Sequence, residues 1–478
     1  MNYLLRTKRA VTFFTVWILS ISLLEAQGIN TSAGQINTVT TAVPFLRIIS
    51  DARAGGMGDV GIATPIYGNG ENEGDYRSPD VNGLYTNPAK LAFIDKDFGF
   101  AVTFSPWLRT LVNDIYLANL AGYYKVKKMQ TVAVSIRYFS LGNITFTDLN
   151  GATTGEFRPN EFAIDGHYAR RLGDIFSIAA SLRVVYSNLA GGQQVDNNLI
   201  KPGVAGSGDI SWFVRKRFNE NNAHKLEHEL TVGMNISNIG SKISYTSNIT
   251  KDYIPTNLGI GVGYTLNIDK HNSIGFYVDM NKLLVPSPVP GNILLDSTGK
   301  ILPKYDKNTN NVPDWKEKSS IGGMFTSFGD APGGSAEEFK EVTWGIGAEY
   351  LYNKQFGVRF GYFYEHAQKG NRQFLTAGLT VKYSVVGLNF SYLIPTTIQR
   401  NPLDNTIRFS LLFDFLNGGK KSTNETGVSL VPDEPKKKKE KKTGAEETKP
   451  TETKPAESKP GDDKPIIKEG KLEPVEPK

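Results

Sequence analysis

Three glycines, Gly56, Gly58 and Gly61, have the G-x-G-x-x-G spacing of loops that hold the pyrophosphate of a dinucleotide. Such a loop follows a strand and opens a helix whose N-terminus faces the phosphates. The apolar run FLRII does precede these glycines, but Pro65 would stop a helix almost where it should begin. The residues that follow, YGNGENEGDYRSPDVNG, show no helical period. The context therefore disfavours a dinucleotide site, and the glycines need another explanation.

A second chemical pattern is DKNTNNVPD, in which Asp306, Asn308 and Asn310 alternate along the chain like the first oxygen ligands of a calcium loop. The pattern lacks the glycine at position six and the bidentate glutamate at position twelve. These residues therefore match only part of a calcium loop. We name them as a candidate and predict no metal ion. The alternative is an ordinary polar loop tip.

Histidines are the remaining candidates for catalysis. The chain has five: His167, His224, His228, His271 and His366. His224 and His228 are four apart, but in a predicted turn and strand, where this spacing does not make a zinc pair as it does on a helix. The sequence has no cysteine and no G-x-S-x-G motif, and it shows no Ser/His/acid set on neighbouring predicted strands. We predict no catalytic residues and no cofactor; an enzyme remains an alternative that needs a nucleophile with a base in hydrogen-bond reach.

Residues 1–26 are predicted to be a secretory signal peptide. Basic Arg6, Lys8 and Arg9 precede an apolar core at 11–24, and Ala26 is a small residue at the cleavage point. The alternative is an uncleaved anchor, but the core is shorter than the roughly 20 apolar residues of a spanning helix. No second long apolar run follows, which excludes helical spans but not a β-barrel.

Residues 418–478 have a different composition from the rest of the chain. They lack aromatic residues, and Lys-Pro recurs every five residues from Lys449. Such a segment buries too little apolar surface to fold, so we predict a disordered periplasmic tail. The run KKKKEKK favours a solvated spacer, with anionic lipid or an acidic partner as the alternative. The formal net charge of the whole chain is only +6, which gives no case for nucleic acid.

Residues 98–417 read as strand after strand. In the third strand Val132, Val134 and Ile136 share one face, while Ser135 and Arg137 share the other, and this period of two indicates a strand with one apolar face. Strands of about ten residues with aromatic ends suit a tilted bilayer crossing. We predict fourteen strands, at 98–107, 115–126, 131–141, 160–172, 176–189, 206–218, 228–239, 256–268, 273–284, 341–352, 355–366, 373–385, 387–396 and 405–415.

The connections test this interpretation independently. Most connections after even-numbered strands are short, and most after odd-numbered strands are long, the longest running from 286 to about 340. Outer-membrane barrels have short periplasmic turns and long outer loops. The predicted fold is therefore all-β, a 14-stranded antiparallel transmembrane outer-membrane barrel with both termini in the periplasm. A soluble β-sandwich or propeller is the alternative, and it gives no reason for this alternation.

Residues 27–97 precede the first strand and are predicted to be a periplasmic or plug segment. A fourteen-stranded barrel leaves a lumen that something must fill, and a glycine-rich backbone packs closely against a wall. We therefore interpret the glycines as part of a plug, whose charges would pair with lumen charges such as Arg137 or Arg359. The plug motif comprises Asp51, Arg53, Gly55, Gly56, Gly58, Asp59, Asn87 and Pro88.

The stretch SDARAGGMGDVGIAT, followed by YTNPAKLAF, resembles the opening of the fatty-acid-transporter-like, or FadL-like, family of outer-membrane barrels. In that family an Ala-Arg-rich Gly-Met-Gly element precedes an Asn-Pro-Ala motif. Within it, FLRIISDARAGGMGDVGIAT and GGMFTSFGDAPGG resemble the PorV barrels of the type IX secretion system. The resemblance covers 43–415 and not the Lys/Pro tail.

This resemblance implies a non-enzymatic protein that binds the C-terminal signal domain of secreted cargo at the translocon. It further implies that the protein passes cargo to a sortase-like attachment complex at the cell surface, and that a SprA-type translocon barrel is its partner. The alternative function is a FadL-type transporter of hydrophobic solutes. The transporter needs a continuous apolar pocket in the lumen, whereas the cargo-binding protein suits a packed plug with charged partners.

The long loop between the ninth and tenth predicted strands is the candidate contact surface. Its stretch SSIGGMFTSFGDAPGGSAEEF places apolar residues among glycines outside the membrane, which is unfavourable in water unless something covers them. The alternative is that the cluster caps the barrel's own mouth. The candidate partner-binding residues are Met324, Phe325, Phe328, Asp330 and Pro332.

Overall fold

The computed structural model describes residues 37–65, 80–107, 114–147, 150–192, 194–195, 198–219, 226–246, 251–269, 271–353, 355–397 and 406–415. The predicted signal peptide (1–26), the predicted tail (418–478) and His224 lie outside these residues. None of the described helices is long and apolar enough to cross a membrane.

Within the described residues, fourteen strands form a closed antiparallel barrel, as the alternation of the sequence predicts. Each strand pairs with its neighbours in chain order, and β1 closes the ring against β18, with Phe98 opposite Phe415. The strands are β1 (Phe98–Pro106), β2 (Ile115–Lys127), β3 (Gln130–Leu141), β6 (Asn160–Arg171), β7 (Phe176–Asn188), β10 (Gly203–Phe218), β11 (Glu227–Gly240), β12 (Asn257–Asn267), β13 (Asn272–Leu283), β14 (Thr343–Tyr352), β15 (Phe356–Tyr364), β16 (Gln373–Tyr383), β17 (Val386–Pro395) and β18 (Ile407–Phe415).

Side chains alternate between the two faces of the wall as the sequence pattern predicts. In β3, Val134 faces outward and is 66% exposed, whereas Ser135 and Arg137 face inward and are buried. Phe363 in β15 breaks the pattern because it is an aromatic residue on the inner face. It stacks there on Phe374 of β16 with ring centroids 4.8 Å apart, so this inward aromatic pair fills part of the lumen.

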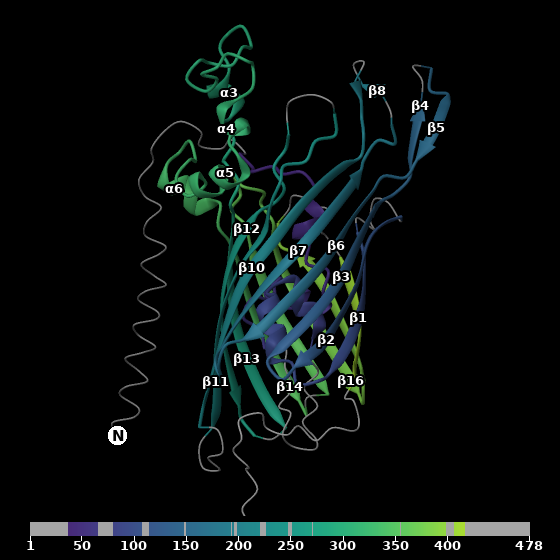
Figure 1. Ribbon diagram of the computed structural model, residues 1–478, viewed down its shortest axis with the longest axis vertical. Coiled ribbons are helices and arrows are strands. Elements are labelled where there is room, and N and C mark those ends of the chain that lie inside the picture. The colour runs from purple at the N-terminus through teal and green to yellow at the C-terminus, as the bar shows by residue number, and fades with distance from the viewer. Residues whose placement is uncertain are drawn as a thin grey trace, which may run out of the picture. The chain divides into compact units, whose positions relative to one another are not determined.

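The connections give the barrel two distinct ends (Figure 1). At one end, which we call the short-turn end, brief turns join successive strands. At the other, the long-loop end, the chain forms two small hairpins and a helical loop between β13 and β14. The hairpins are β4 (Ile144–Thr147) with β5 (Thr153–Phe157), and β8 (Gln194–Val195) with β9 (Asn198–Leu199). The helices of the loop are α3 (Gly291–Leu294), α4 (Asp314–Glu317), α5 (Ser320–Thr326) and α6 (Ser335–Lys340).

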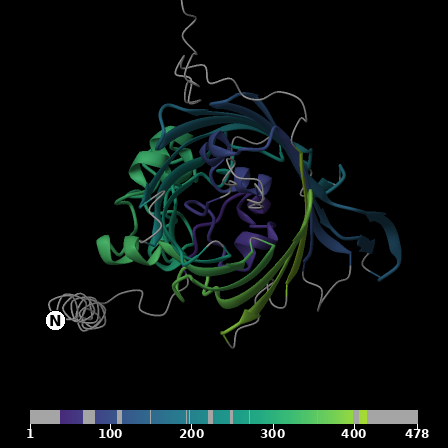
Figure 2. The ribbon, with the colours of Figure 1, turned by 90° about the horizontal axis from the view of Figure 1, so that it is seen from below.

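The residues before β1 fill the lumen (Figure 2). They form four short helices, η1 (Pro44–Arg47), α2 (Ala52–Gly55), η2 (Val81–Tyr85) and η3 (Pro88–Phe93). Around η1 an apolar cluster includes Phe45, which stacks near Phe139 of β3 with ring centroids 6.2 Å apart. Around η3 a second cluster includes Phe93, whose ring meets Phe213 of β10 edge-on at 5.7 Å. Charged and glycine-rich segments lie between the two clusters.

The lumen segment runs from the long-loop end to the short-turn end. Its first described residue, Asn37, donates its backbone N–H to the carbonyl of Gln368, 3.0 Å away in the β15–β16 loop. Its last helix ends near Ile94, whose carbonyl accepts from Lys125 Nζ at 2.7 Å at the end of β2. Neither chain terminus lies among the described residues, so the expectation that both termini are periplasmic stays a prediction; the first described residue of the lumen segment lies at the long-loop end. An even number of strands fixes only where the first strand begins and the last one ends.

Candidate functional site

The glycine motif lies inside the barrel, where backbone meets backbone. A β-carbon added to Gly56 would lie 2.9 Å from the Cα of Gly378 in β16. Gly58 has a φ of 70°, and the backbone of Tyr362 leaves no room for a β-carbon. Both its backbone conformation and this close contact therefore favour glycine. The wall contributes Gly361, where an added β-carbon would lie 2.1 Å from the carbonyl carbon of Met57. The spacing that resembles a dinucleotide loop therefore serves close packing of a plug against the wall.

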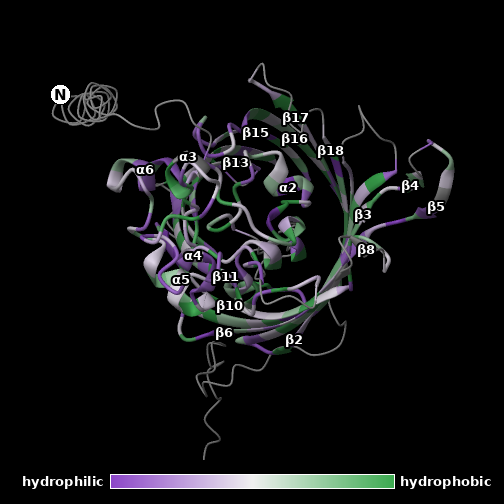
Figure 3. Cartoon of the chain, turned by 90° about the horizontal axis from the view of Figure 1, so that it is seen from above, coloured by the Kyte–Doolittle hydropathy of each residue, from purple (hydrophilic) through white to green (hydrophobic). Residues whose placement is uncertain are grey.

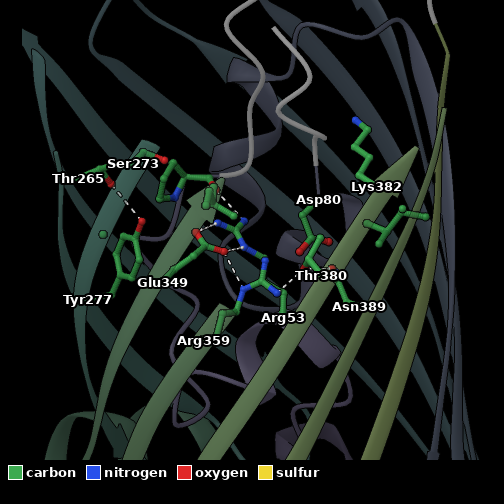
Figure 4. A pocket seen from close by; sticks show the side chains of 15 residues that line it. Arg53, Asp80, Thr265, Ser273, Tyr277, Glu349, Arg359, Thr380, Lys382 and Asn389 are labelled. Carbon is green, nitrogen blue, oxygen red and sulfur yellow. Dashed lines mark hydrogen bonds and ion pairs between the residues drawn. The ribbon is translucent and has the colours of Figure 1, made fainter. Parts of the chain in front are cut away.

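Arg53 from α2 forms the main ionic contact between plug and wall (Figure 4). Its Nε and Nη2 donate to the two carboxylate oxygens of Glu349 in β14 at 3.0 and 2.8 Å. Arg359 of β15 donates to the same carboxylate at 2.7 Å. All three side chains are buried, so one carboxylate lies between two guanidinium groups. Arg53 thus pairs with a lumen charge, the carboxylate of Glu349. Arg359, which the sequence named as a lumen charge, binds the same carboxylate.

The two aspartates of the motif have different roles. Asp51 caps α2, accepting from the backbone N–H groups of Arg53 at 3.1 Å and Ala54 at 3.0 Å. Asp59 lies 3.4 Å from Arg408 of β18, and Arg408 also donates to the carbonyl of Gly55. Neither aspartate pairs with the arginines expected from the sequence. The sequence did not single out Glu349 or Arg408 as partners of the plug, although strand alternation puts both residues on the inner face.

Asn87 and Pro88 begin η3 and join the plug to the wall. Asn87 accepts from the N–H of Ala89 at 3.1 Å and donates to the carbonyls of Ile62 and Trp212 at 3.1 and 3.0 Å. Pro88 occupies the first helical position, where a missing N–H has no cost. Three residues after Asn87, the buried Lys90 donates to the carbonyl of Gly61 and to Thr86 Oγ1. The Asn-Pro motif and the glycine motif therefore hold each other in place.

A buried polar network crosses the wall at β3, β6 and β7, and it corrects one expectation. His167 Nδ1 lies 2.7 Å from Ser181 Oγ, and Asp165 accepts from Ser135 Oγ at 2.8 Å. A Ser/His/acid set does therefore lie on neighbouring strands. The antiparallel register, which pairs Ser135 with Asp165 and His167 with Ser181, brings it together.

This network does not have the geometry of a catalytic triad. The carboxylate of Asp165 binds Ser135 and Arg183, and not the imidazole of His167. In a triad the acid orients the histidine that activates the serine. Arg183 continues the network by donating to both oxygens of Asp209 at 3.0 and 2.9 Å. The arrangement compensates buried charges, which is a structural role.

Two small hollows lie between the plug and the wall in the described part of the lumen. The hollow shown in Figure 4 has a volume of about 70 Å³, and its lining includes Arg53, Asp80, Glu349, Arg359 and Lys382. A second hollow of about 100 Å³ is bordered by Asp59, Asn235, Asp279 and Arg372, among others. Both are small, and charged side chains are among the residues that line them. The lumen thus resembles a packed plug with ionic partners more than a passage for an apolar solute.

The candidate contact residues lie on and after α5, at one side of the long-loop end (Figure 3). Ile321, Phe325 and Phe328 follow one another at intervals of four and three residues, and they are 61%, 70% and 55% exposed. The opposite face of α5 is anchored, because Gly323 packs against Pro286. These phenylalanines therefore face solvent and do not close the barrel's own mouth. Met324 is half-buried and Pro332 is exposed.

Asp330 has a different environment from the phenylalanines. It accepts from the backbone N–H of Ser287 at 3.2 Å and lies 3.7 Å from Lys318 Nζ. Burial raises the pKa of this carboxyl group above its ordinary value. Asp330 thus holds the loop in place. The sequence did not single out Phe339 on α6, another helix of the same loop, although it is 78% exposed. A large apolar residue in a helix rich in charged residues was the sequence signal that could have identified Phe339.

The helical loop is fastened to the barrel by buried ion pairs. Lys282, at the end of β13, lies 2.8 Å from Glu338 and 2.7 Å from Glu341. Lys369, in the β15–β16 loop, lies 3.0 Å from Glu341 and 2.6 Å from Glu337. Each lysine therefore bridges two glutamates of α6 or its C-terminus. These contacts anchor α6, at the base of the loop, to the barrel.

The calcium-loop candidate is an internally bonded turn. Asp306 accepts from the N–H groups of Asn310 at 3.2 Å and Asn311 at 2.8 Å, and Asn310 Oδ1 accepts from Val312 N at 2.9 Å. The side-chain amides of Asn308 and Asn310 both donate to Glu317. Within the residues described, no group of three or more histidine, aspartate or glutamate side chains is placed to hold a metal ion.

Comparisons with solved structures give distant matches. The toluene transporter TodX of Pseudomonas putida is 10% identical, with a TM-score of 0.40, over 79% of this chain and 98% of that one. The toluene transporter TbuX of Ralstonia pickettii is 12% identical, with a TM-score of 0.36, over 76% and 97%. A FadL homologue of Pseudomonas aeruginosa is 9% identical, with a TM-score of 0.35, over 80% and 100%. No curated protein sequence matches the chain.

A family model gives the decisive comparison. The model described as the type IX secretion system protein PorV matches residues 31–290, more than half of the chain. The matched residues include the whole lumen segment and the strands from β1 to β13. The chain is therefore an outer-membrane β-barrel that belongs to the PorV family of the type IX secretion system.

Proposed function

We propose that this protein binds the C-terminal signal domain of secreted cargo at the translocon and delivers the cargo to a sortase-like attachment complex. Membership of the PorV family links the chain to type IX secretion in the outer membrane. The proposal adds the cargo, the attachment complex and a SprA-type translocon barrel as partners. The proposed role is non-enzymatic.

The observation that carries the proposal is an exposed apolar surface above a filled lumen. We call it the α5 surface and define it as Ile321, Phe325 and Phe328. Solvent exposure of three large apolar side chains in one row is unfavourable, and such rows commonly mark a protein-binding site. The anchored base of the loop adds to the argument, because a rigid surface loses less entropy on binding.

Transport of hydrophobic solutes is the weaker proposal. A transporter of fatty acids or similar solutes needs an apolar route through the lumen. The two hollows between plug and wall are instead lined with charged and amide groups, among them Arg53, Glu349 and Asp279. Moving an apolar solute past them would require the plug to break its ion pairs with the wall.

We further propose an orientation in which the short-turn end faces the periplasm. Outer-membrane barrels have their longer loops outside. The α5 surface is then on the outer side, where secreted cargo emerges, and the end of β18 faces the periplasm. Asn37 lies at the outer end of the lumen segment in this orientation. The expectation of two periplasmic termini stays a prediction, because both termini lie outside the described residues.

The test is a crosslinking pull-down from native outer membranes with the tagged full-length chain. We compare the wild type with a Phe325→Ala/Phe328→Ala double variant. The control is Ile144→Ala, which removes an exposed apolar residue from β4 on another long loop. We expect the wild type and the control to recover secreted proteins that share one C-terminal domain, together with a very large barrel protein. The double variant should keep the large barrel and lose the cargo.

Two outcomes would contradict the proposal. Equal recovery of cargo by the double variant would remove the α5 surface from the contact. Recovery of fatty acid or other lipid, with no protein partner in any sample, would favour the transporter.

A further inference from the structure

A second surface feature lies at the long-loop end, between the start of the lumen segment and the wall. It is a hollow of about 440 Å³, within the range of ligand pockets. Its apolar lining comes from Val43, Phe139, Leu141, Leu189 and Tyr245. Two carboxylates, Glu161 and Asp252, also border it.

Glu161 is the unusual member of this lining. It lies at the outer end of β6 and is only 2% exposed. Within the described part of the chain, its carboxylate receives one hydrogen bond, from Ser187 Oγ to Oε1 at 2.6 Å, and has no lysine or arginine within salt-bridge distance. A buried carboxylate that lacks a counter-charge is unfavourable unless something compensates it.

Other inward-facing carboxylates of the barrel strands are compensated. Asp165 and Asp209 both bind Arg183, and Glu229 lies 3.2 Å from Arg215. Asp279 has no such cation but accepts from two backbone N–H groups at 2.7 and 2.8 Å. Among the described residues, Glu161 has neither the cation nor the pair of backbone N–H groups that compensates these four carboxylates.

We propose that this hollow binds the side chain of a lysine or arginine from an extended partner peptide. The cationic head would bind Glu161, with Asp252 at the rim adding negative charge. The methylene stem would lie along Leu141, Leu189 and Tyr245, since long basic side chains pack their stems on apolar surface. Glu161 and Asp252 are the only two carboxylates in this lining, and no described group of three histidine, aspartate or glutamate side chains is placed to hold a metal ion, so a charged side chain fits better.

The neighbouring backbone indicates a peptide and not a free amine. Thr40 and Thr41 border the hollow, and their backbone groups have no hydrogen bond among the described residues. Next to them, Ala42 N–H donates to the carbonyl of Tyr253 at 2.9 Å, which fixes this part of the chain. An extended peptide beside Thr40 and Thr41 would find free donors and acceptors. The proposed cargo is the natural source of such a peptide, and to that extent the inference rests on the proposed function.

The test measures peptide binding to the full-length chain in detergent micelles. The probe is an acetylated and amidated pentapeptide with one lysine between valine and threonine residues. Its matched control carries norleucine in place of lysine, and cadaverine serves as a free amine. The variant is Glu161→Gln, which keeps an acceptor for Ser187. Its control is Glu156→Gln on β5, where the side chain is exposed.

We expect the lysine peptide to bind about tenfold more tightly than the norleucine peptide, as a charge-assisted hydrogen bond provides. Glu161→Gln should remove this preference, and Glu156→Gln should keep it. Equal binding of the two peptides, or full binding of the lysine peptide by Glu161→Gln, would overturn the proposal. If cadaverine binds as tightly as the lysine peptide, the hollow recognises an amine, and the proposal that it binds a peptide would be overturned.

A second measurement separates binding from a structural role. Without ligand, Glu161→Gln should leave the thermal midpoint unchanged or raise it, because an uncompensated charge is removed. A lowered midpoint would mean that Glu161 stabilises the fold, which contradicts the inference. Peptide binding does not depend on secretion, so a failed titration alongside a successful cargo pull-down would sink this inference and leave the proposed function standing.

Discussion

The lumen and the long-loop end of this barrel differ in how their charged and apolar side chains are compensated or covered. In the lumen, Glu349 lies between Arg53 and Arg359, and glycine backbones fill the remaining space. At the long-loop end, Phe325 faces solvent, and Glu161 is buried with a single hydroxyl partner among the described residues. The first arrangement stabilises the folded chain and the second does not. The difference is the one expected if the lumen is a structural filling and the long-loop end, as proposed, binds another molecule.

The largest expected effect is in the lumen, from Glu349→Gln. This change leaves two buried guanidinium groups facing each other without a carboxylate, and we expect a loss of about 3–5 kcal/mol in the free energy of unfolding. Urea titration of the detergent-solubilised protein measures it. The control is Glu156→Gln at an exposed site, with an expected change within about 0.5 kcal/mol. If Glu349→Gln lowers the free energy of unfolding no more than the control does, water solvates the charges of the lumen. The lumen and the long-loop end would then not differ in how their charges are compensated.

The next effect concerns the fit between plug and wall. Gly361→Ala places a β-carbon 2.1 Å from the carbonyl carbon of Met57, where backbone must move to make room. Overpacking of this kind lowers stability by about 1–3 kcal/mol. Gly166→Ala in β6 is the matched control, since nothing lies within 4 Å of its added β-carbon. Thermal unfolding should separate the two variants, and identical midpoints would show that the plug adapts to its wall.

The wall was largely predictable from the sequence, and the contacts across the lumen were not. Alternation at Val134 and Ser135 identifies strand faces locally, and fourteen such segments specify a barrel. The pairing of Ser135 with Asp165 depends instead on the register between strands, which side-chain alternation alone does not fix. The direction of the lumen segment was also out of reach, because strand parity carries no information about residues before Phe98. Glu349 and Arg359 could both be placed on the inner face, but their contact with each other and with Arg53 could not be predicted.

A smaller effect is expected from pH at the base of the helical loop. Partial burial tends to raise the pKa of Glu337, but hydrogen bonds from Lys369, Asn37 and the Gly333 N–H outweigh it, so its pKa lies below the ordinary value. A carboxyl whose pKa is lower in the folded state stabilises that state fully above its unfolded pKa. The contribution is lost as pH falls through the folded pKa.

Hydrogen exchange measures this effect. Protection of the α6 amides should be constant above about pH 5 and should fall in more acidic solution, where glutamates titrate. Lys369→Met removes the strongest partner and should flatten the pH dependence of that protection. The lumen serves as the internal reference, since its amides should keep their protection over the same range. Loss of protection in both regions together would indicate global unfolding and not opening of the loop.

The smallest effect on stability is expected at the α5 surface, which is the proposed binding site for cargo. Phe325→Ala removes a side chain that is 70% exposed, so the free energy of unfolding should change by about 0.5 kcal/mol or less. The same change at Phe213, which is fully buried against Phe93, should lower it by about 3–5 kcal/mol. Urea titration of both variants compares one chemical change in the two regions. A large loss at Phe325 would mean that this ring supports the loop, and the α5 surface would then be explained by folding alone. A negligible loss together with failed cargo capture would mean that the ring acts only when a partner covers it.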